Sequence, residues 1–307
     1  MKSIQKLAVP LKSFLIILVV ISAIFIAYHD ALNNDSLAWD TEGYVTNNDH
    51  IKALNWENIQ WMFTHFHMAN WHPLTWFSHA LDYACFGLNP WGHHFVSLLI
   101  HTFNTVLLFV LVIVLMSFKP TLEISTDRFA PVSNKRLLAA GISAIWFGIH
   151  PQHVESVVWV AERKDVLCLF FILLALLSYV FYNAASRTKK RLFWYFSTLL
   201  CFALALLAKP MAVTFPVILL LMDVYPLNRT HLTSPLRRDR ISYKIIMFEK
   251  IPFFVLTLVS VAITMLAQHH AGSISNLESV GIPIRLLNAF NSLIFYLSKF
   301  LFPIGLS

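Results

Sequence analysis

Charged residues are scarce in this chain. They make up 13% of its 307 residues, whereas a soluble domain usually carries about 25%. Hydrophobic residues make up 57% and come in long blocks, a pattern typical of membrane proteins. Because no block resembles a soluble domain of ordinary size, we expect an all-α, polytopic bundle of transmembrane helices.

Cysteine is rare as well. The three cysteines, Cys85, Cys168 and Cys201, show no CxxC or other paired spacing, and two of them lie inside apolar blocks. The sequence therefore gives no indication of a disulfide framework or of a structural zinc site built on cysteine.

Acidic residues are outnumbered by basic ones, which gives a net charge of +7. In a soluble protein this excess would suggest nucleic-acid binding. In a chain this hydrophobic, lysine and arginine are better explained as topological anchors beside membrane spans. We therefore expect the lipid bilayer, and no nucleic acid, among its partners.

About eight apolar blocks have the length or composition of membrane spans. Most approach the roughly 20 residues that a spanning helix needs. The block at 137–149 is short, and only Lys209-Pro210 separates the fifth block from the sixth. The predicted blocks are 13–28, 95–117, 137–149, 166–184, 192–208, 211–224, 251–268 and 286–305.

Lysine and arginine are distributed unequally between the two sides of these spans. If the chain crosses the membrane at every block, one side carries 17 of them and the other side carries 5. The positive-inside rule then predicts a multi-pass protein of the cell membrane with a cytoplasmic N-terminus. The first block resembles a signal-peptide core, but no clear cleavage site follows it, so we expect an uncleaved helix.

Histidine and tryptophan gather on the predicted outer side. Twelve of 14 histidines lie there, and six of nine tryptophans lie between Trp39 and Trp91. The long outer loop at 29–94 is therefore expected to form interfacial helices that lie on the membrane. Its aromatic rings fit an interfacial belt, a sugar-binding groove, or both.

Two carboxylates near the start of this loop are candidate catalytic groups. Asp40 and Glu42 follow shortly after the first span, at a depth where a carboxylate can act as a general base or bind a metal ion. The alternative is that both are merely solvated, as most loop carboxylates are.

A second concentration of polar residues occupies the short outer loop at 150–165. His150 and His153 are three residues apart, with Glu155 close by, so they could share a helical face as a metal site or proton relay. The ions of such a loop are costly near a bilayer and tend to be functional. A divalent cation is therefore allowed here but not required.

The end of that loop carries Glu162, Arg163, Lys164 and Asp165 in succession. Arg163 and Lys164 could clamp phosphate oxygens. Alternatively, the four charges pair with one another and cap the next helix. Lys209, alone between two apolar blocks, either snorkels toward water or meets an anion.

Several strings resemble a known family. The chain is similar, over about 12–305, to bacterial membrane proteins that carry C-terminal tetratricopeptide repeats and to the transmembrane and tetratricopeptide-repeat O-mannosyltransferases of animals, which act on cadherins. Both belong to the C-type glycosyltransferase superfamily. The matching strings are Trp39-Asp40-x-Glu42-x-Tyr44-Val45, Asn70-Trp71-His72-Pro73-Leu74-Thr75-Trp76, Phe86-Gly87-Leu88-Asn89-Pro90, His150-Pro151-x-His153-x-Glu155, Ala161-Glu162-Arg163-Lys164-Asp165 and Ala208-Lys209-Pro210, followed by Asp223-x-Tyr225-Pro226.

The resemblance implies transfer of a sugar, such as mannose, from a polyprenyl-phosphate donor to a hydroxyl of an exported protein or glycan outside the cytoplasm. The family's catalytic base lies in an acidic motif of the first outer loop, usually two adjacent aspartates. Here Thr41 replaces the second aspartate, so Asp40 is the first candidate for the base and Glu42 the second.

Further site residues follow from the same resemblance. Three cations would bind the donor phosphate, and five other side chains would shape the pocket. His150, His153 and Glu155 would hold a divalent cation if one is present. The phosphate-binding candidates are Arg163, Lys164 and Lys209; the pocket candidates are His72, His150, His153, Glu155 and Asp165.

The repeats of these relatives have no counterpart in the sequence, which shows no 34-residue helical period. We therefore interpret 1–307 as one membrane domain, truncated before a repeat domain, with a large outer loop at 29–94. A non-catalytic scaffold or inactive fragment is the main alternative function. A transporter is disfavoured because the charges lie at span ends, and a metalloprotease because the H-E-x-x-H motif is missing.

Overall fold

The computed structural model describes residues 11–35, 39–119, 128–229, 243–273 and 281–305. Within these ranges the chain is helical and forms no strand, which confirms the all-α prediction. Some of the predicted topological anchors and the end of the chain lie outside the described residues; they are Lys2, Lys6, Arg237, Arg238, Arg240 and Ser307.

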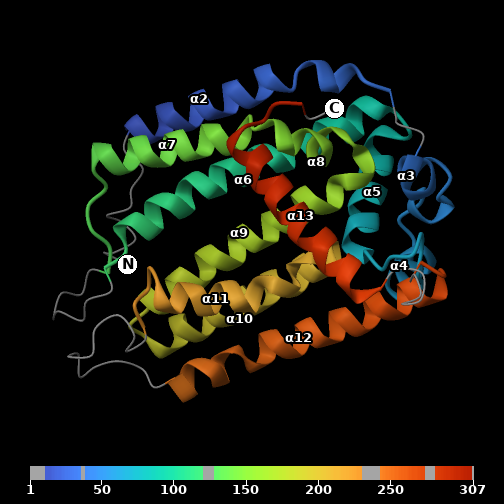
Figure 1. Ribbon diagram of the computed structural model, residues 1–307. Coiled ribbons are helices and arrows are strands. Elements are labelled where there is room, and N and C mark those ends of the chain that lie inside the picture. Colours follow the sequence, from blue (N-terminus) through green and yellow to red (C-terminus); the bar gives the residue numbers. More distant parts are fainter. Residues whose placement is uncertain (1–10, 36–38, 120–127, 230–242, 274–280, 306–307) are drawn as a thin grey trace.

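Each of the eight predicted apolar blocks contains or overlaps a helix (Figure 1). The sixth block is divided between a short 3-10 helix, Pro210–Thr214, and α11. The long helices are α2 (Leu11–Ala27), α6 (Pro90–Ser117), α7 (Asn134–Gly148), α9 (Arg163–Ala184), α10 (Thr188–Ala208), α11 (Phe215–Val224), α12 (Tyr243–His270) and α13 (Ile282–Leu301).

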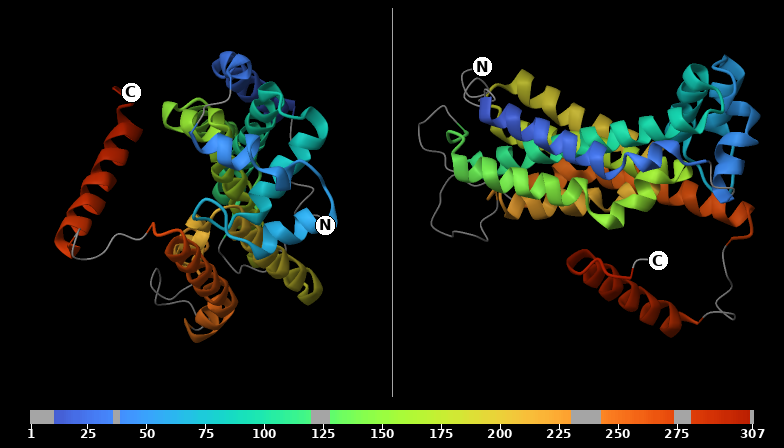
Figure 2. Two further views of the ribbon diagram at one scale, coloured as in Figure 1. Left: turned by 90° about the vertical axis from the view of Figure 1, so that its right-hand side faces the viewer. Right: turned by 90° about the horizontal axis from the view of Figure 1, so that it is seen from above.

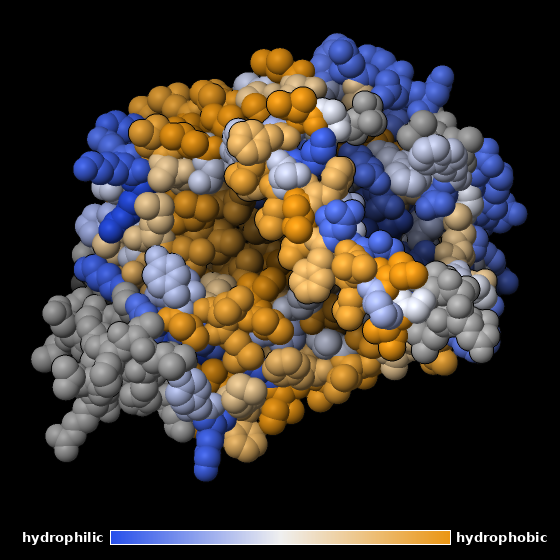
Figure 3. Space-filling model, viewed as in Figure 1, coloured by the Kyte–Doolittle hydropathy of each residue, from blue (hydrophilic) through white to orange (hydrophobic). Residues whose placement is uncertain are grey.

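Among the described residues, four helical segments are long and apolar enough to cross a membrane: Pro90–Ser117, Val160–Ala184, Thr188–Ala208 and Tyr243–His270. Two apolar helical segments, Leu11–Ala27 and Pro210–Val224, are shorter. The multi-pass architecture therefore holds, while the number of eight spans stays a prediction. Figure 3 shows the matching surface, with hydrophobic residues over the middle of the molecule and hydrophilic residues at its two ends.

The helices pack as a bundle around α6 and α9, which run in the same direction, since Arg163 at the start of α9 contacts His93 near the start of α6. α9 lies between α6 and α10, and α7 packs between α2 and α6. The core where α10, α11 and α12 meet is aromatic: Phe202, Phe215 and Phe253 are fully buried and their rings lie 5.1 to 6.3 Å apart. α13 has no buried residue, and most of it stands away from the bundle in both views of Figure 2; its last turns contact His150 and Gln152.

A buried ionic network joins three helices at the end of the bundle where α12 begins. Asp223 on α11 accepts a hydrogen bond from Tyr179 on α9 (2.5 Å) and pairs with Arg229 (2.9 Å) and Lys250 (2.7 Å). Arg229 also pairs with Glu249 on α12 (2.8 Å). We call this end the far end.

The opposite end carries the folded first outer loop, which we call the cap (residues 39–86; Figure 1). Trp76 on α5 is fully buried there, 5.3 Å from Trp61 on α4, so part of the tryptophan set forms the cap's core. Trp39 and Trp56 remain mostly exposed. The cap consists of α3 (Trp39–Thr41), a π-helical turn (Glu42–Thr46), a 3-10 turn (Asp49–Ile51), α4 (Trp56–Thr64) and α5 (Pro73–Phe86).

Candidate functional site

The acidic motif forms the first helical turns of the cap. Asp40 is partly buried on α3, whereas Glu42, two residues on, is exposed. Residues two apart on a helix point in different directions, while residues four apart share a face. Asp40 therefore shares its face with Tyr44, which is fully buried. Burial first, and then the charges of Asp40 and Glu162, raise the pKa of Tyr44.

Tyr44 links the acidic motif to charges from distant parts of the chain. Its hydroxyl lies 3.1 Å from Nδ1 of His72, and Nζ of Lys164 lies 5.0 Å from its ring centre. Burial, together with the charges of Lys164 and Lys209, lowers the pKa of His72 to about 3. At neutral pH the Tyr44–His72 pair is therefore uncharged, and Lys164 is the cation that lies against the Tyr44 ring.

Glu162, Lys164, Asp165 and Lys209 form what we call the lysine cluster. Glu162 pairs with Lys164 (2.7 Å) and with Lys209 (3.2 Å), and Lys209 also pairs with Asp165. Burial lowers the pKa of Lys209, but the carboxylates of Asp165 and Glu162 raise it by more, so the net shift is upward. Of the internal pairing considered from the sequence, only the Glu162–Lys164 pair is present, and Lys209 meets anions rather than snorkelling freely.

The lysine cluster is not sealed. The Lys209 side chain is 23% exposed and that of Lys164 is 8% exposed. The hydroxyl of Thr75 in the cap donates to the carbonyl oxygen of Ala208 (2.9 Å), and Ser156 donates to Asp165 (3.0 Å). The cap and the loop before α9 therefore fix the position of Lys209 and leave its side chain partly exposed.

Arg163 is placed differently from its neighbour, and its predicted role as a phosphate ligand needs correction. Its side chain is fully buried and pairs with Asp82 through Nη1. Nε donates to Ser97 (3.1 Å) and Nη2 to the carbonyl oxygen of His93 (2.5 Å). A guanidinium whose nitrogens are all engaged inside the protein cannot reach a phosphate, so Arg163 instead holds α9 against α5 and α6.

The proposed metal group at His150, His153 and Glu155 is not brought together. His150 donates from Nε2 to the carbonyl oxygen of Phe300 (3.0 Å), and Glu155 is exposed. His153 packs on the ring of Phe147 (4.5 Å), and burial, then His101 and His150, lower its pKa to about 4. His150 and His153 therefore pack against Phe300 and Phe147, and the three side chains are not gathered into one ligand set.

Sequence reasoning missed a different group. In the part of the chain that the structure describes, the one set of three potential ligands whose donor atoms all lie within 4.8 Å of one another is His79, Asp82 and His93. The signal that could have found it is the His79-x-x-Asp82 spacing, one turn apart on a helix of the cap.

A small cavity lies beside the acidic motif. It has a volume of about 260 Å³, and Trp159 is one of its walls. The indole of Trp159 donates to Thr41 (3.2 Å) and meets Trp39 edge to face (5.8 Å), so Trp159 contacts both residues that flank Asp40. The cavity is lined by Asn34, Asp35, His94, Val158, Trp159 and Val160.

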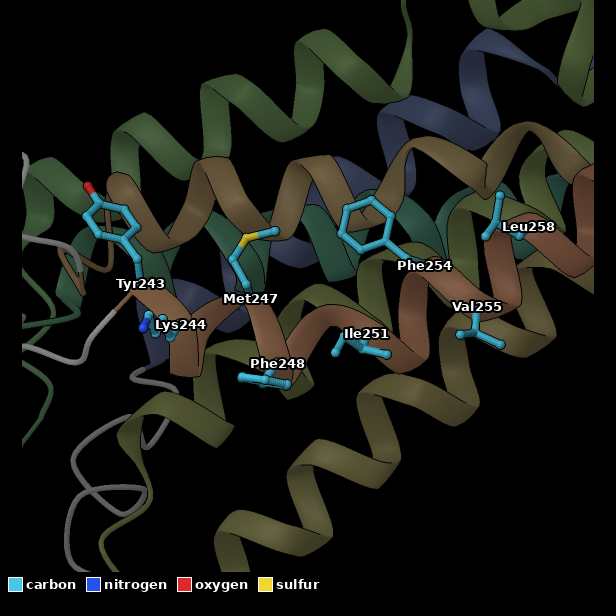
Figure 4. A pocket seen from close by; sticks show the side chains of 8 residues that line it. All are labelled: Tyr243, Lys244, Met247, Phe248, Ile251, Phe254, Val255 and Leu258. Carbon is cyan, nitrogen blue, oxygen red and sulfur yellow. The ribbon is translucent and has the colours of Figure 1, made fainter.

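A larger groove, of about 460 Å³, runs along one face of α12 (Figure 4). Its walls are apolar apart from Tyr243 and Lys244, and they run from Tyr243 at the far end to Leu258. The composition of the groove suits contact with lipid chains.

Together, the apolar helices, the folded cap and the charged cluster beneath it define a multi-pass helical membrane protein with a polar site at one end. Residues 163–271 match the family of dolichyl-phosphate-mannose-protein mannosyltransferases. That match includes Lys164, Asp165 and Lys209 but not Asp40.

Curated relatives give the same result. The chain is 28% identical to protein O-mannosyl-transferase TMTC2 of Mus musculus over 66% of this chain and 23% of that protein. It is 28% identical to protein O-mannosyl-transferase TMTC4 of Homo sapiens over 64% of this chain and 27% of that protein. No solved structure gave a significant match.

The chain spans about a quarter of the length of these two relatives. The matches confirm the resemblance drawn from the sequence motifs, which is to the O-mannosyltransferases among the C-type membrane glycosyltransferases.

Proposed function

We propose that this chain carries the membrane-embedded site of a glycosyltransferase that moves mannose from a polyprenyl-phosphate donor to a hydroxyl of an exported protein. One observation carries the proposal: Asp40 of the acidic motif shares a helix face with Tyr44, whose ring lies against Lys164 of the lysine cluster. A base and two phosphate-binding cations, from segments more than 100 residues apart, thus meet at one end of the bundle.

The chemistry that we propose is an inverting displacement. Asp40 removes the proton of the acceptor hydroxyl, whose oxygen forms a bond to the anomeric carbon of the sugar. The bond from that carbon to the phosphate oxygen breaks, and the polyprenyl phosphate leaves with the electron pair. Lys164 and Lys209 stabilise the negative charge on the departing phosphate. Inversion requires one base, which suits a motif that keeps Asp40 but not its acidic neighbour.

The carboxylates of the lysine cluster have a place in this scheme. Glu162 pairs with both lysines, so their two ammonium groups are already held against one carboxylate before a donor binds. Preorganised charges stabilise a transition state without the cost of reorganising at the moment of reaction. We propose that phosphate oxygens bind the exposed side of Lys209 while Glu162 and Asp165 keep the pair in position.

The cavity beside Trp159 is our candidate for the sugar subsite. It offers an indole face together with the amide of Asn34 and the carboxylate of Asp35. An apolar wall combined with a few polar groups is the usual composition of a small-molecule site. Because Trp159 contacts the residues on both sides of Asp40, a sugar in this cavity would lie next to the proposed base.

The test is transfer of radiolabelled mannose to exported proteins in membranes that contain this chain. Donors would be polyprenyl-phosphate mannose and, in parallel, nucleotide-linked mannose. We expect transfer from the lipid donor alone, and a loss on the order of 100-fold in Lys164→Met and Lys209→Met. A matched control is Lys52→Met, which removes an exposed ion pair in the same cap.

A non-catalytic scaffold is the alternative, and one observation favours it. Lys164 and Lys209 are already neutralised by Glu162 and Asp165, as in a purely structural network. No transfer by wild-type protein that is inserted and folded, under conditions where a full-length relative is active, would overturn the transferase proposal in favour of this alternative.

A further inference from the structure

His79, Asp82 and His93 converge where α5 and α6 meet, beneath the cap. His79 and Asp82 are one turn apart on α5, and His93 lies in the first turn of α6. All three are buried, with 0%, 4% and 2% of their surface exposed, and their donor atoms lie within 4.8 Å of one another. The proposed transfer chemistry uses none of them.

The protonation of His93 is fixed by its backbone partner. Nε2 lies 3.0 Å from the carbonyl oxygen of Gly87, which can only accept, so Nε2 carries the proton. Gly87 presents that oxygen from a backbone at φ +62°, a conformation that favours glycine. The other nitrogen, Nδ1, then has a free lone pair, and it faces Oδ2 of Asp82 at 3.3 Å without a hydrogen-bond partner.

Two acceptors that face each other at this distance repel unless a positive charge lies between them. A second proton on His93 would supply one, but it leaves His79 unexplained. Both ring nitrogens of His79 are buried and lack hydrogen-bond partners. Buried polar groups without partners are uncommon and call for an explanation. A metal ion shared by the three residues accounts for both His93 and His79.

The geometry fits a small divalent ion. Zinc binds imidazole nitrogen and carboxylate oxygen at about 2.0–2.2 Å, which places tetrahedral ligands about 3.3–3.6 Å apart. The observed separation of Nδ1 of His93 from Oδ2 of Asp82 is 3.3 Å. Metal-bound histidines commonly donate their other N–H to a backbone carbonyl, as Nε2 of His93 does to Gly87.

Arg163 disfavours such an ion electrostatically, but it also fixes the orientation of the ligand Asp82. Its guanidinium pairs with the same carboxylate oxygen of Asp82, and its positive charge lowers the affinity of the site for any cation. A carboxylate oxygen has two lone pairs, so it can accept from Arg163 and still bind a metal. The same contact fixes the rotamer of Asp82, as outer-shell partners of metal ligands do.

We infer that His79, Asp82 and His93 form a structural site for a divalent transition metal, with zinc as the best fit, which ties α5 to α6 directly behind the start of α9. Three protein ligands leave a fourth position for water. The ion fixes the position of Asp82, which pairs with Arg163, and Arg163 is the residue before Lys164. The metal site thus stabilises the start of α9, which carries the lysine cluster, without touching substrate.

The experiment is metal analysis of the full chain, purified in detergent through an affinity tag that contains no histidine. We expect on the order of one zinc ion per chain in wild type and background levels in His79→Gln and His93→Gln. The matched control is His94→Gln, which changes the buried neighbour of His93 and should keep the metal. Size-exclusion profiles establish that each variant is folded.

If the ligand variants fail to fold, X-ray absorption at the zinc edge of wild-type protein still decides the question. We expect nitrogen and oxygen scatterers at about 2.0–2.1 Å with imidazole features and no sulfur. A metal-free wild-type protein that is folded, sulfur in the coordination shell, or full metal content in His79→Gln would each overturn the inference. Because metal content is read directly, the result does not depend on transferase activity.

Discussion

At the scale of single residues, burial decides what each charged side chain can do. Arg163 and Lys164 are adjacent in the sequence, yet Arg163 is sealed against Asp82 whereas Lys164 faces Tyr44 in the cap. Successive residues on a helix point about 100° apart, so neighbours at the start of α9 serve different partners. The same rule separates the partly buried Asp40 from the exposed Glu42.

His72 gives a pH-dependent prediction at this scale. Its pKa is lowered from 6.5 to about 3 in the folded protein by burial, Lys164 and Lys209. Between these values the unfolded chain binds more protons than the folded one, so stability falls as the pH falls from 6.5 toward 3. We expect the free energy of unfolding to fall less between pH 7 and pH 5 in His72→Gln than in wild type, as measured by thermal unfolding. The difference should be at most about 1.4 kcal/mol per pH unit.

Tyr44→Phe is the control for the lost hydrogen bond, because it removes the hydroxyl that contacts His72 but keeps the imidazole. This variant should retain the wild-type pH dependence. An unchanged pH slope in His72→Gln would contradict a neutral, buried imidazole at this position.

The sequence could identify which segments of the site carry charge but not how the charges pair. Residues 162–165 were predicted as a polar concentration, but only Glu162 and Lys164 pair with each other, whereas Asp165 pairs with Lys209. The partner of Arg163 is Asp82, 81 residues earlier in the chain, and no local pattern specifies such a contact. The same limit explains why the proximity of His79 to His93 could not be predicted and why the spacing of His150 and His153 did not place them in one ligand set.

At the scale of helices, apolar length predicts where elements form, and buried ions decide how they are joined. The predicted blocks all contain helix because long apolar runs bury themselves or meet lipid. Their boundaries shift outward where polar residues continue the helix, as in α12, which begins at Tyr243 rather than at residue 251. The hydrogen bond and ion pairs through which Asp223 links α9, α11 and α12 cannot be predicted from hydropathy.

Asp223→Ala tests this joint. The substitution leaves Lys250, which is fully buried, without its partner at 2.7 Å and removes one partner of Arg229. Breaking a buried ion pair from one side typically costs about 3–5 kcal/mol. We expect a loss of this size in the unfolding free energy of purified protein. Asp49→Ala, which removes a pair exposed to solvent, should cause no measurable change; equal effects of the two variants would contradict the buried joint.

At the scale of the whole molecule, the helices of the cap, α3 to α5, lie at one end of the bundle, and α12 begins at the other (Figure 1). Contacts with the cap place the lysine cluster at the first end, and contacts with Lys250 place Asp223 at the second. The distribution of lysine and arginine predicts that the cap end is extracytoplasmic. The architecture was largely predictable because a bilayer permits few solutions. The number of spans was less predictable than the architecture, because α7 and α11 are shorter than a bilayer requires.

The native cysteines allow the predicted orientation in the membrane to be tested. Cys85 is exposed on α5 of the cap, whereas Cys168 is buried in α9. We expect a membrane-impermeant maleimide to label intact cells that express the chain, and Cys85→Ser to abolish that labelling. Labelling that requires permeabilised cells would place the cap in the cytoplasm and contradict the predicted topology.

The central claim is that Asp40 is the base of a sugar transfer whose phosphate leaves toward Lys164 and Lys209. It is tested most directly by the single-turnover rate of mannose transfer at saturating polyprenyl-phosphate donor. The account predicts that Asp40→Asn lowers this rate about 10²–10⁴-fold, while Glu42→Gln stays within a few-fold of wild type. A wild-type rate in Asp40→Asn, or the large loss in Glu42→Gln instead, would contradict it.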